Sequence, residues 1–262
     1  MQRDSVTYIV GFAAVVCIVC GLMVSSAAVA LKTQQTANAA FDKQRNVLYA
    51  TGLASPAAGL SREQLETIYD ERVKPVVIDL KSGDVVDSPS FDPATYDMDK
   101  AADGADTGMP APENSSSIQR LPKEAVIYQV TGEGGEVEMI VLPIKGYGLW
   151  STLYGFLALD KDTTTVRGIT YYKHGETPGL GGEVDNPNWK AKWPGRKAYN
   201  DQWQPALQVI KGQAGPPSSA PHQVDGLSGA SITSRGVSNM LHFWLGDGGF
   251  APYLAKFREQ HS

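Results

Sequence analysis

Cysteine is scarce in this chain of 262 residues, which has two, Cys17 and Cys20, both in the first apolar stretch. The rest of the chain therefore holds neither a disulfide framework nor a cysteine metal site. A C-x-x-C pair can indicate redox chemistry, but this one lacks a polar context, and small polarizable side chains one helical turn apart pack well in lipid. Packing is the favoured interpretation. His174 and His222 show no metal-ligand spacing, so no metal site is predicted.

Runs of basic residues are also missing. The chain has 23 Lys and Arg against 28 Asp and Glu, a formal charge of -5. Binding to a phosphate backbone needs a concentrated Lys/Arg surface, so a nucleic-acid partner is excluded. The length allows one or two domains, and 27 Gly and 16 Pro favour many loops between short strands in a folded α+β protein.

Charge is absent from residues 6–31, which are long enough for one transmembrane helix, since roughly 20 apolar residues span a bilayer. The alternative is a cleaved signal peptide, with Arg3 as a thin basic start and residues 28–30 as an A-x-A site. The apolar stretch 8–24 is longer than the usual core of a signal peptide. A retained anchor is therefore favoured.

The charges around this helix leave its orientation open. Arg3 precedes it, whereas Lys32, Lys43 and Arg45 follow it, which weakly favours a cytoplasmic domain. Long domains, however, translocate largely regardless of such charges. No acidic residue lies in the span, so a sodium path through this helix is not predicted.

Beyond the anchor the pattern predicts a helix over residues 34–50 and a second one opened by a capping box at residues 61–64. Pro75 is expected to stop the second helix, and residues 76–80 to form a buried strand. Residues 92–122 are acidic and rich in Ala, Gly, Pro and Ser, which predicts a solvated surface loop or linker.

Four strands follow, in two pairs joined by turns. They are predicted over residues 125–130, 137–142, 152–160 and 166–172. Short turns between neighbours favour an antiparallel sheet. The predicted fold class is α+β, with one N-terminal transmembrane helix followed by a soluble domain whose antiparallel sheet is flanked by helices.

The strongest helix signal in the soluble part runs from about Ser234 to Leu245 and is ended by Gly246. Residues 225–233 stand just before it and are rich in Gly and small hydroxyl residues. Free N–H groups and the positive end of the helix dipole suit an anion such as phosphate there. An ordinary Ser/Thr helix cap is the alternative, and spacing alone favours the cap.

Residues 225–231 read D-G-L-S-G-A-S and resemble the D-x-x-[ST]-G-A-[ST] signature of FMN-binding domains, in which FMN is attached through its phosphate to the final hydroxyl. Three further segments resemble the same family, namely 146–150, 174–181 and 243–247. With its anchor, the whole chain resembles the C subunits of the sodium-translocating NADH:quinone oxidoreductases. We call residues 225–231 the signature.

The resemblance implies a single-pass flavoprotein of the bacterial inner membrane with its soluble domain in the periplasm, in complex with the A, B, D, E and F subunits. It implies electron relay from NADH toward ubiquinone, coupled to sodium export, with no catalytic residue of its own. The implied organisation is a tail (1–5), the transmembrane helix (6–31), a membrane-proximal region with an acidic loop (32–122) and the FMN-binding domain (123–262). Alternatives are the flavin subunit of an Rnf-type ferredoxin:NAD complex and a non-redox envelope FMN-binding module.

Ser231 is the implied acceptor of one FMN per chain through a phosphoester. The family usually has Thr at this position, but serine offers the same oxygen, and Thr233 is the fallback acceptor. No base is evident beside Ser231, which implies a separate flavin transferase that moves FMN from FAD with Mg²⁺. Residues of the signature then serve as part of the finished site and as its recognition sequence: Asp225, Ser228, Gly229 and Ala230.

Other flavin contacts are predicted in two places. A loop with Glu176, Thr177, Gly179 and Leu180 is expected against the isoalloxazine ring, or else forms a tight surface turn. Lys211 would place positive charge near the flavin, or is simply solvated. Tyr147 and Trp150 are expected to fill core rather than to pack on the flavin.

Overall fold

The computed structural model describes residues 5–87, 89, 91–93 and 95–261. Apart from Ser5, the predicted tail therefore lies outside the described residues. The chain divides into two compact units, Met1–Asp42 and Lys43–Ser262. One helix, α1 (Val6–Thr51), contributes to both of them.

Helix α1 merges the two helices that the sequence predicts over 6–31 and 34–50 into one of 46 residues. Residues 22–51 contain neither Gly nor Pro, so nothing breaks the backbone hydrogen bonds between them. Gly52, with φ 76°, follows its last residue. The helix is long and apolar enough to cross a membrane, and side chains such as Phe12 and Leu22 are exposed. A signal sequence has the same properties, so retention of the anchor stays a prediction.

Helix α2 (Arg62–Arg72) begins with the predicted capping box, because Gln64 N donates to Ser61 Oγ (3.3 Å) and Ser61 N to Gln64 Oε1 (2.8 Å). The predicted role of Pro75 is wrong. The helix ends at Arg72, and Pro75 lies inside strand β1 (Val73–Asp79). Strand β1 is at the edge of its sheet, where a residue without an N–H is tolerated.

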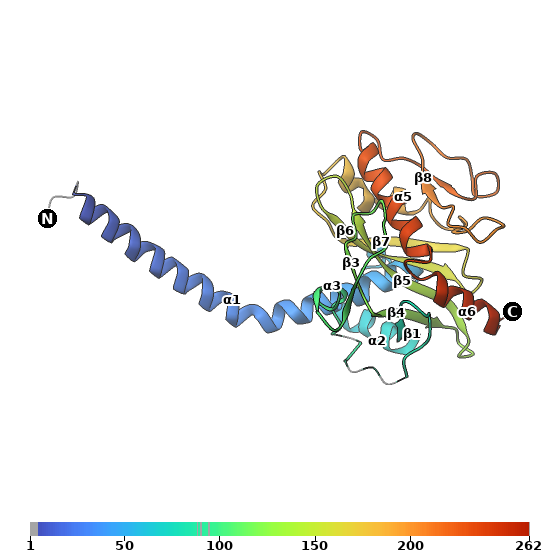
Figure 1. The fold of residues 1–262 in the computed structure, drawn as a ribbon, viewed down its shortest axis with the longest axis horizontal. Helices are drawn as coiled ribbons and strands as arrows, with labels where there is room; N and C mark the ends of the chain where they lie inside the picture. Colours follow the sequence, from blue (N-terminus) through green and yellow to red (C-terminus); the bar gives the residue numbers. More distant parts are fainter. Residues whose placement is uncertain (1–4, 88, 90, 94, 262) are drawn as a thin grey trace. The chain divides into compact units, whose positions relative to one another are not determined.

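The main sheet has five antiparallel strands in the order β1-β4-β5-β6-β7 (Figure 1). The four strands predicted between residues 125 and 172 are present; the third has the predicted bounds, and the other three are longer, the second by five residues. They are β4 (Glu124–Thr131), β5 (Val137–Tyr147), β6 (Thr152–Asp160) and β7 (Val166–Lys173). The predicted α+β fold class is confirmed.

The segment predicted as a solvated loop, 92–122, contains three regular elements, so that prediction is wrong for those parts of it. It contains α3 (Met98–Asp103), whose first N–H groups are capped by Asp97, and the small sheet of β2 (Gly108–Pro110) and β3 (Arg120–Pro122). Scattered apolar residues hold it down, as Leu121 is 1% exposed. Strand β1 precedes the predicted domain boundary after residue 122, and its partner β4 follows that boundary. The division into two domains at this point stays a prediction.

Smaller elements complete the chain. They are η1 (Pro56–Ala58), η2 (Gly181–Asp185), α4 (Pro187–Lys190), β8 (Gln208–Val209), β9 (Gln223–Val224), α5 (Ser231–Leu245) and α6 (Ala251–His261). Helix α5 begins three residues earlier than predicted. Ser234 N donates to Ala230 O (3.0 Å), which makes Ala230 the N-cap and Ser231 the first helical residue.

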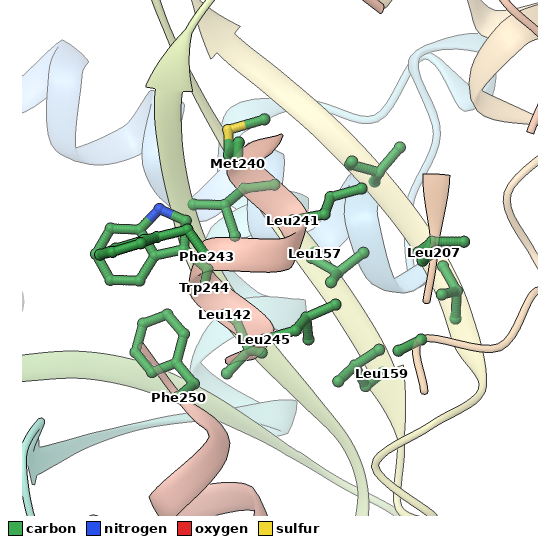
Figure 2. Close-up of a cluster of buried hydrophobic side chains, with 14 of the residues drawn as sticks. Leu142, Leu157, Leu159, Leu207, Met240, Leu241, Phe243, Trp244, Leu245 and Phe250 are labelled. Atoms are coloured by element: carbon green, nitrogen blue, oxygen red, sulfur yellow. The ribbon is translucent and has the colours of Figure 1, made fainter. Parts of the chain in front are cut away.

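Helix α5 lies on one face of the main sheet and forms the centre of the core (Figure 2). Its buried Met240, Leu241 and Trp244 pack with Leu142 of β5 and Leu157 of β6. Trp244 Nε1 also donates to Lys145 O (2.7 Å). The C-terminal end of α1 lies against β7, where Thr170 Oγ1 donates to Asn46 O (3.1 Å). The packing of α5 fixes where its first turn, and with it the signature, lies.

Candidate functional site

The signature ends on the first residue of α5. Ser231 is exposed, and its N-cap Ala230 is buried and has no side-chain bond to offer. Within the described part of the chain, the backbone N–H groups of Ser231, Ile232 and Thr233 have no acceptor. Three free donors at the positive end of a 15-residue helix form a setting that favours an anion.

Thr233, the fallback acceptor, is fully buried. Its hydroxyl donates to Glu176 Oε2 at 2.6 Å. Two residues of separation on a helix point the side chains of Ser231 and Thr233 in different directions. The structure therefore separates the two candidate hydroxyls: one faces solvent and the other serves a buried carboxylate.

Glu176 joins three segments of the chain. Besides the Thr233 hydroxyl, its carboxylate accepts N–H groups of Leu149 (3.1 Å), Trp150 (2.9 Å) and Ser151 (3.2 Å). Burial raises the pKa of this carboxyl, but the bonds from Thr233 and from the three N–H groups outweigh burial and hold the pKa below its usual value. Its oxygens are thus occupied inside the protein.

Two close approaches pack the predicted flavin loop against α5. A Cβ on Gly181 would lie 2.6 Å from Thr233 Oγ1, and one on Gly229 would lie 2.9 Å from Leu180 Cδ2. Gly229 also has φ 69°, a left-handed conformation that glycine adopts freely. Leu180 therefore touches the signature itself, and the neighbouring Thr177 and Gly179 are exposed beside it.

An apolar rim, which we define as Leu149, Trp150, Leu180 and Ile232, is exposed around this turn. The exposed fractions range from 37% for Leu149 to 66% for Trp150. The prediction that Tyr147 and Trp150 fill core is wrong, since Tyr147 is also 46% exposed. Tyr147 is the last residue of β5 and Trp150 follows it; Tyr147 OH donates to Trp150 O (3.4 Å), and the chain leaves the core there. Apolar side chains that gather at one place on a surface are typical of binding sites.

Asp225, at the other end of the signature, is 9% exposed. Its carboxylate forms an ion pair with Lys192 and accepts Ala214 N (3.0 Å), while its carbonyl accepts Trp189 Nε1 (2.8 Å). Burial raises the pKa of this carboxyl, but Lys192 and the Ala214 N–H outweigh burial and lower the pKa. Sequence analysis missed Lys192, which is 33 residues away and belongs to no recognisable motif.

Lys211 is exposed on a turn that lies directly beside the signature. Ile210 N donates to Val224 O (2.9 Å), and Gly226 N donates to Gly212 O (2.8 Å), so backbone bonds flank Lys211 on both sides. Ser228 is exposed as well. The structure thus brings together nearly all the predicted site residues, and it turns the carboxylates of Glu176 and Asp225 inward.

Comparison with known proteins places this site in a family. The profile of the FMN-binding domain matches residues 148–246. A curated relative from Pseudomonas aeruginosa, the C subunit of the Na(+)-translocating NADH-quinone reductase, is 48% identical over 261 residues, which cover 98% of each chain. The chain belongs to the family of C subunits of this reductase. The corresponding protein of Yersinia pestis is 43% identical over 98% of this chain and 95% of its own.

Solved structures of the same family have the same fold. The crystal structure of Shewanella oneidensis NqrC matches with a TM-score of 0.76 and 32% identity, over 82% of this chain and 96% of that one. The family member from Parabacteroides distasonis matches with a TM-score of 0.66 and 26% identity, over 86% and 96%. The matched FMN-binding region contains the apolar rim, Glu176 and the whole signature.

Proposed function

We propose that this chain is a membrane-anchored flavoprotein subunit of a sodium-pumping NADH:ubiquinone oxidoreductase and carries one FMN on Ser231 through a phosphoester. The observation that carries the proposal is the exposed Ser231 hydroxyl on the first turn of α5, next to three N–H groups without acceptors in the described part of the chain. A phosphodiester has one negative charge, and this helix end stabilises it. The burial of Thr233 and its bond to Glu176 argue against Thr233 as the acceptor.

The residues around Ser231 fit the rest of the flavin. The apolar rim offers Leu180 and Ile232 for the isoalloxazine ring, and the exposed Thr177 and Gly179 offer polar backbone groups at its edge. Lys211 supplies a positive charge nearby. Bound FMN supplies the redox chemistry, because it takes up and releases one or two electrons. The protein holds it beside open solvent, where another protein of the complex is able to approach.

Attachment needs an outside catalyst. Glu176, the carboxylate that contacts the first turn of α5, already accepts from Thr233 and from three N–H groups and is not free to take the proton of Ser231. We therefore expect a flavin transferase to use FAD and Mg²⁺. The serine oxygen forms a bond to the FMN phosphorus, the pyrophosphate bond of FAD breaks so that AMP leaves, and the serine proton passes to solvent. The A, B, D, E and F subunits then surround the finished flavoprotein.

The direct test is the covalent flavin itself. The full-length chain, produced with and without the transferase, is run on a denaturing gel and weighed intact. We expect yellow fluorescence and the added mass of one FMN less water only with the transferase. A chain without flavin in both cases favours the non-redox envelope module, and purification of the labelled chain with Rnf-type subunits favours that alternative complex.

The location of the two units is a separate part of the proposal. We expect α1 to be retained as the anchor and the Lys43–Ser262 unit to lie in the periplasm. N-terminal sequencing of the membrane-extracted chain tests retention, and a mature chain that starts near Leu31 contradicts it. Added protease should digest this unit in spheroplasts, whereas protection of the unit would reverse the topology.

A further inference from the structure

The carboxylate of the signature is not available for a second protein to read. Asp225 is 9% exposed, and both of its side-chain oxygens are occupied, by Lys192 and by Ala214 N. Little of this carboxylate is therefore exposed for a maturation enzyme to contact. The requirement for Asp at this position therefore comes from inside the fold.

Lys192 is held in place at its own backbone. Arg196, which is 4% exposed, donates to Lys192 O (3.1 Å) through Nε and to Gly215 O (2.8 Å) and Ala220 O (2.7 Å) through its terminal nitrogen. The lysine thus reaches Asp225 from a fixed point after α4. A fixed ion pair with a buried carboxylate orients its partner, unlike a mobile surface pair.

Asp225, the partner of Lys192, joins the two segments that carry the predicted cation and the predicted acceptor. Ala214 closes the turn that carries Lys211, and Gly226 N donates to Gly212 O (2.8 Å) within that turn. Asp225 therefore links the Lys211 turn to the start of the signature, six residues before Ser231. If Lys192 is removed, the Asp225 carboxylate loses its ion-pair partner and keeps only the Ala214 N–H bond and the charge of Arg196, which hold it less firmly.

We infer that Lys192 is a positioning residue for flavin attachment, which acts through Asp225 to hold the signature and the Lys211 turn in the arrangement that presents Ser231. The inference rests on the proposed function, because it concerns the same acceptor. Lys192 touches neither Ser231 nor the apolar rim in any described interaction, so its effect passes through Asp225 alone.

The test measures initial rates of flavin attachment to the full-length chain in detergent, with purified transferase, FAD and Mg²⁺. For Lys192→Met we expect the rate at saturating chain concentration to fall about tenfold, which corresponds to about 1.4 kcal/mol, with KM changed less than about twofold. Lys192→Arg should restore most of the rate, since a guanidinium also pairs with a carboxylate. A tenfold slower rate for Lys192→Met at a melting temperature equal to that of Lys192→Arg separates positioning from a general loss of stability.

Lys190→Met is the matched control. Lys190 lies two residues earlier and pairs with Asp185 (3.6 Å) instead of Asp225, so its loss should leave the rate unchanged. The double variant Lys192→Met/Asp225→Asn should be no slower than Asp225→Asn alone, because both changes remove one interaction. Thermal melts confirm that each variant folds, and Lys192→Gln replaces the Met variant if that one does not.

Three outcomes separate a failure of this inference from a failure of the proposed function. Attachment to Lys192→Met at the wild-type rate, with none to Ser231→Ala, overturns the inference and leaves the proposed function standing. The inference is also overturned if the rate for Lys192→Met/Asp225→Asn falls by the product of the two single effects, because Lys192 would then act independently of Asp225. Attachment to Ser231→Ala overturns the proposed function and the inference with it.

Discussion

The first turn of α5 has two sides in opposite environments. Ser231 and Ile232 face solvent, and no described side-chain bond involves them. Thr233 and Ser234 are 0% and 5% exposed, and both hydroxyls are occupied: Thr233 donates to Glu176, and Ser234 accepts Leu227 N (3.1 Å). The hydroxyl chemistry is nearly the same on both sides, so solvent access decides which hydroxyl stabilises the fold and which is free to react.

This division also means that reactivity and stability can be changed independently. Substitutions on the exposed side should alter flavin content with little effect on unfolding. Substitutions on the buried side should lower stability and leave the flavin in place. The expected outcomes below test that separation from its strongest consequence to its weakest.

Ser231→Ala should abolish covalent flavin completely. Its free energy of unfolding should change by less than about 0.5 kcal/mol, because the removed hydroxyl is exposed and has no described partner. In-gel fluorescence and intact mass measure the first effect, and thermal unfolding of the flavin-free chains measures the second. Flavin on this variant, with none on Thr233→Ala, would mean that the two sides have the opposite roles.

Thr233→Val should keep the flavin and lower stability by about 1–3 kcal/mol, since a buried carboxylate loses a hydrogen bond while the side-chain volume is preserved. For a chain of this size that corresponds to a drop in Tm of several degrees. Ile232→Val, at the exposed neighbouring position, is the control. Equal melting temperatures for the wild type, Thr233→Val and Ile232→Val would show that the Thr233 hydroxyl does not stabilise the fold.

The pH dependence of stability should contain a contribution from Glu176. Its folded pKa lies below the unfolded value of about 4.3, so ionised Glu176 stabilises the fold above that pH. As pH falls from about 4.3 through the folded pKa, this stabilisation is lost. Denaturant titrations at several acidic pH values should show a shallower dependence for Glu176→Gln than for the wild type. Glu133→Gln, in the exposed turn between β4 and β5, is the control. Equal dependences for Glu176→Gln and the wild type would contradict the contribution of Glu176.

Ser231→Thr should have the smallest effect. The threonine oxygen is equivalent for attachment, and the added methyl group lies in solvent because position 231 is exposed. Flavin occupancy after complete reaction should match that of the wild type. A threonine variant without flavin would show that the exposed side is shaped for serine alone.

Local patterns predict much of this molecule. The capping box at Ser61, the period-2 strands and the apolar spacing of α5 are interactions between near neighbours, so they can be read from sequence. The position of the signature needs only a short motif at a helix start. The role of Pro75 could not be predicted in this way, because its tolerance depends on β1 being an edge strand, which is a property of the finished sheet.

The supports of the site were not predictable in the same way. Glu176 and Thr233 are 57 residues apart, and Lys192 and Asp225 are 33 apart. A charged residue in a Gly-rich loop looks the same in sequence whether its side chain faces solvent or a buried hydroxyl. The exposure of Trp150 has the same origin, because aromatic residues usually add to a core and this one follows a strand that has already left it.

The place of α5 in the chain sets the order in which the site forms during synthesis. Strands β4 to β7 pair as consecutive hairpins, so the sheet has the local connectivity to form early. The turn with Lys211, the signature and α5 all come later in sequence and dock onto the finished β5 and β6. A chain interrupted before α5 therefore has all five strands of the main sheet but no acceptor. We expect covalent flavin to be found only on chains whose translation has passed this helix, so that it marks chains in which the acceptor helix has been made.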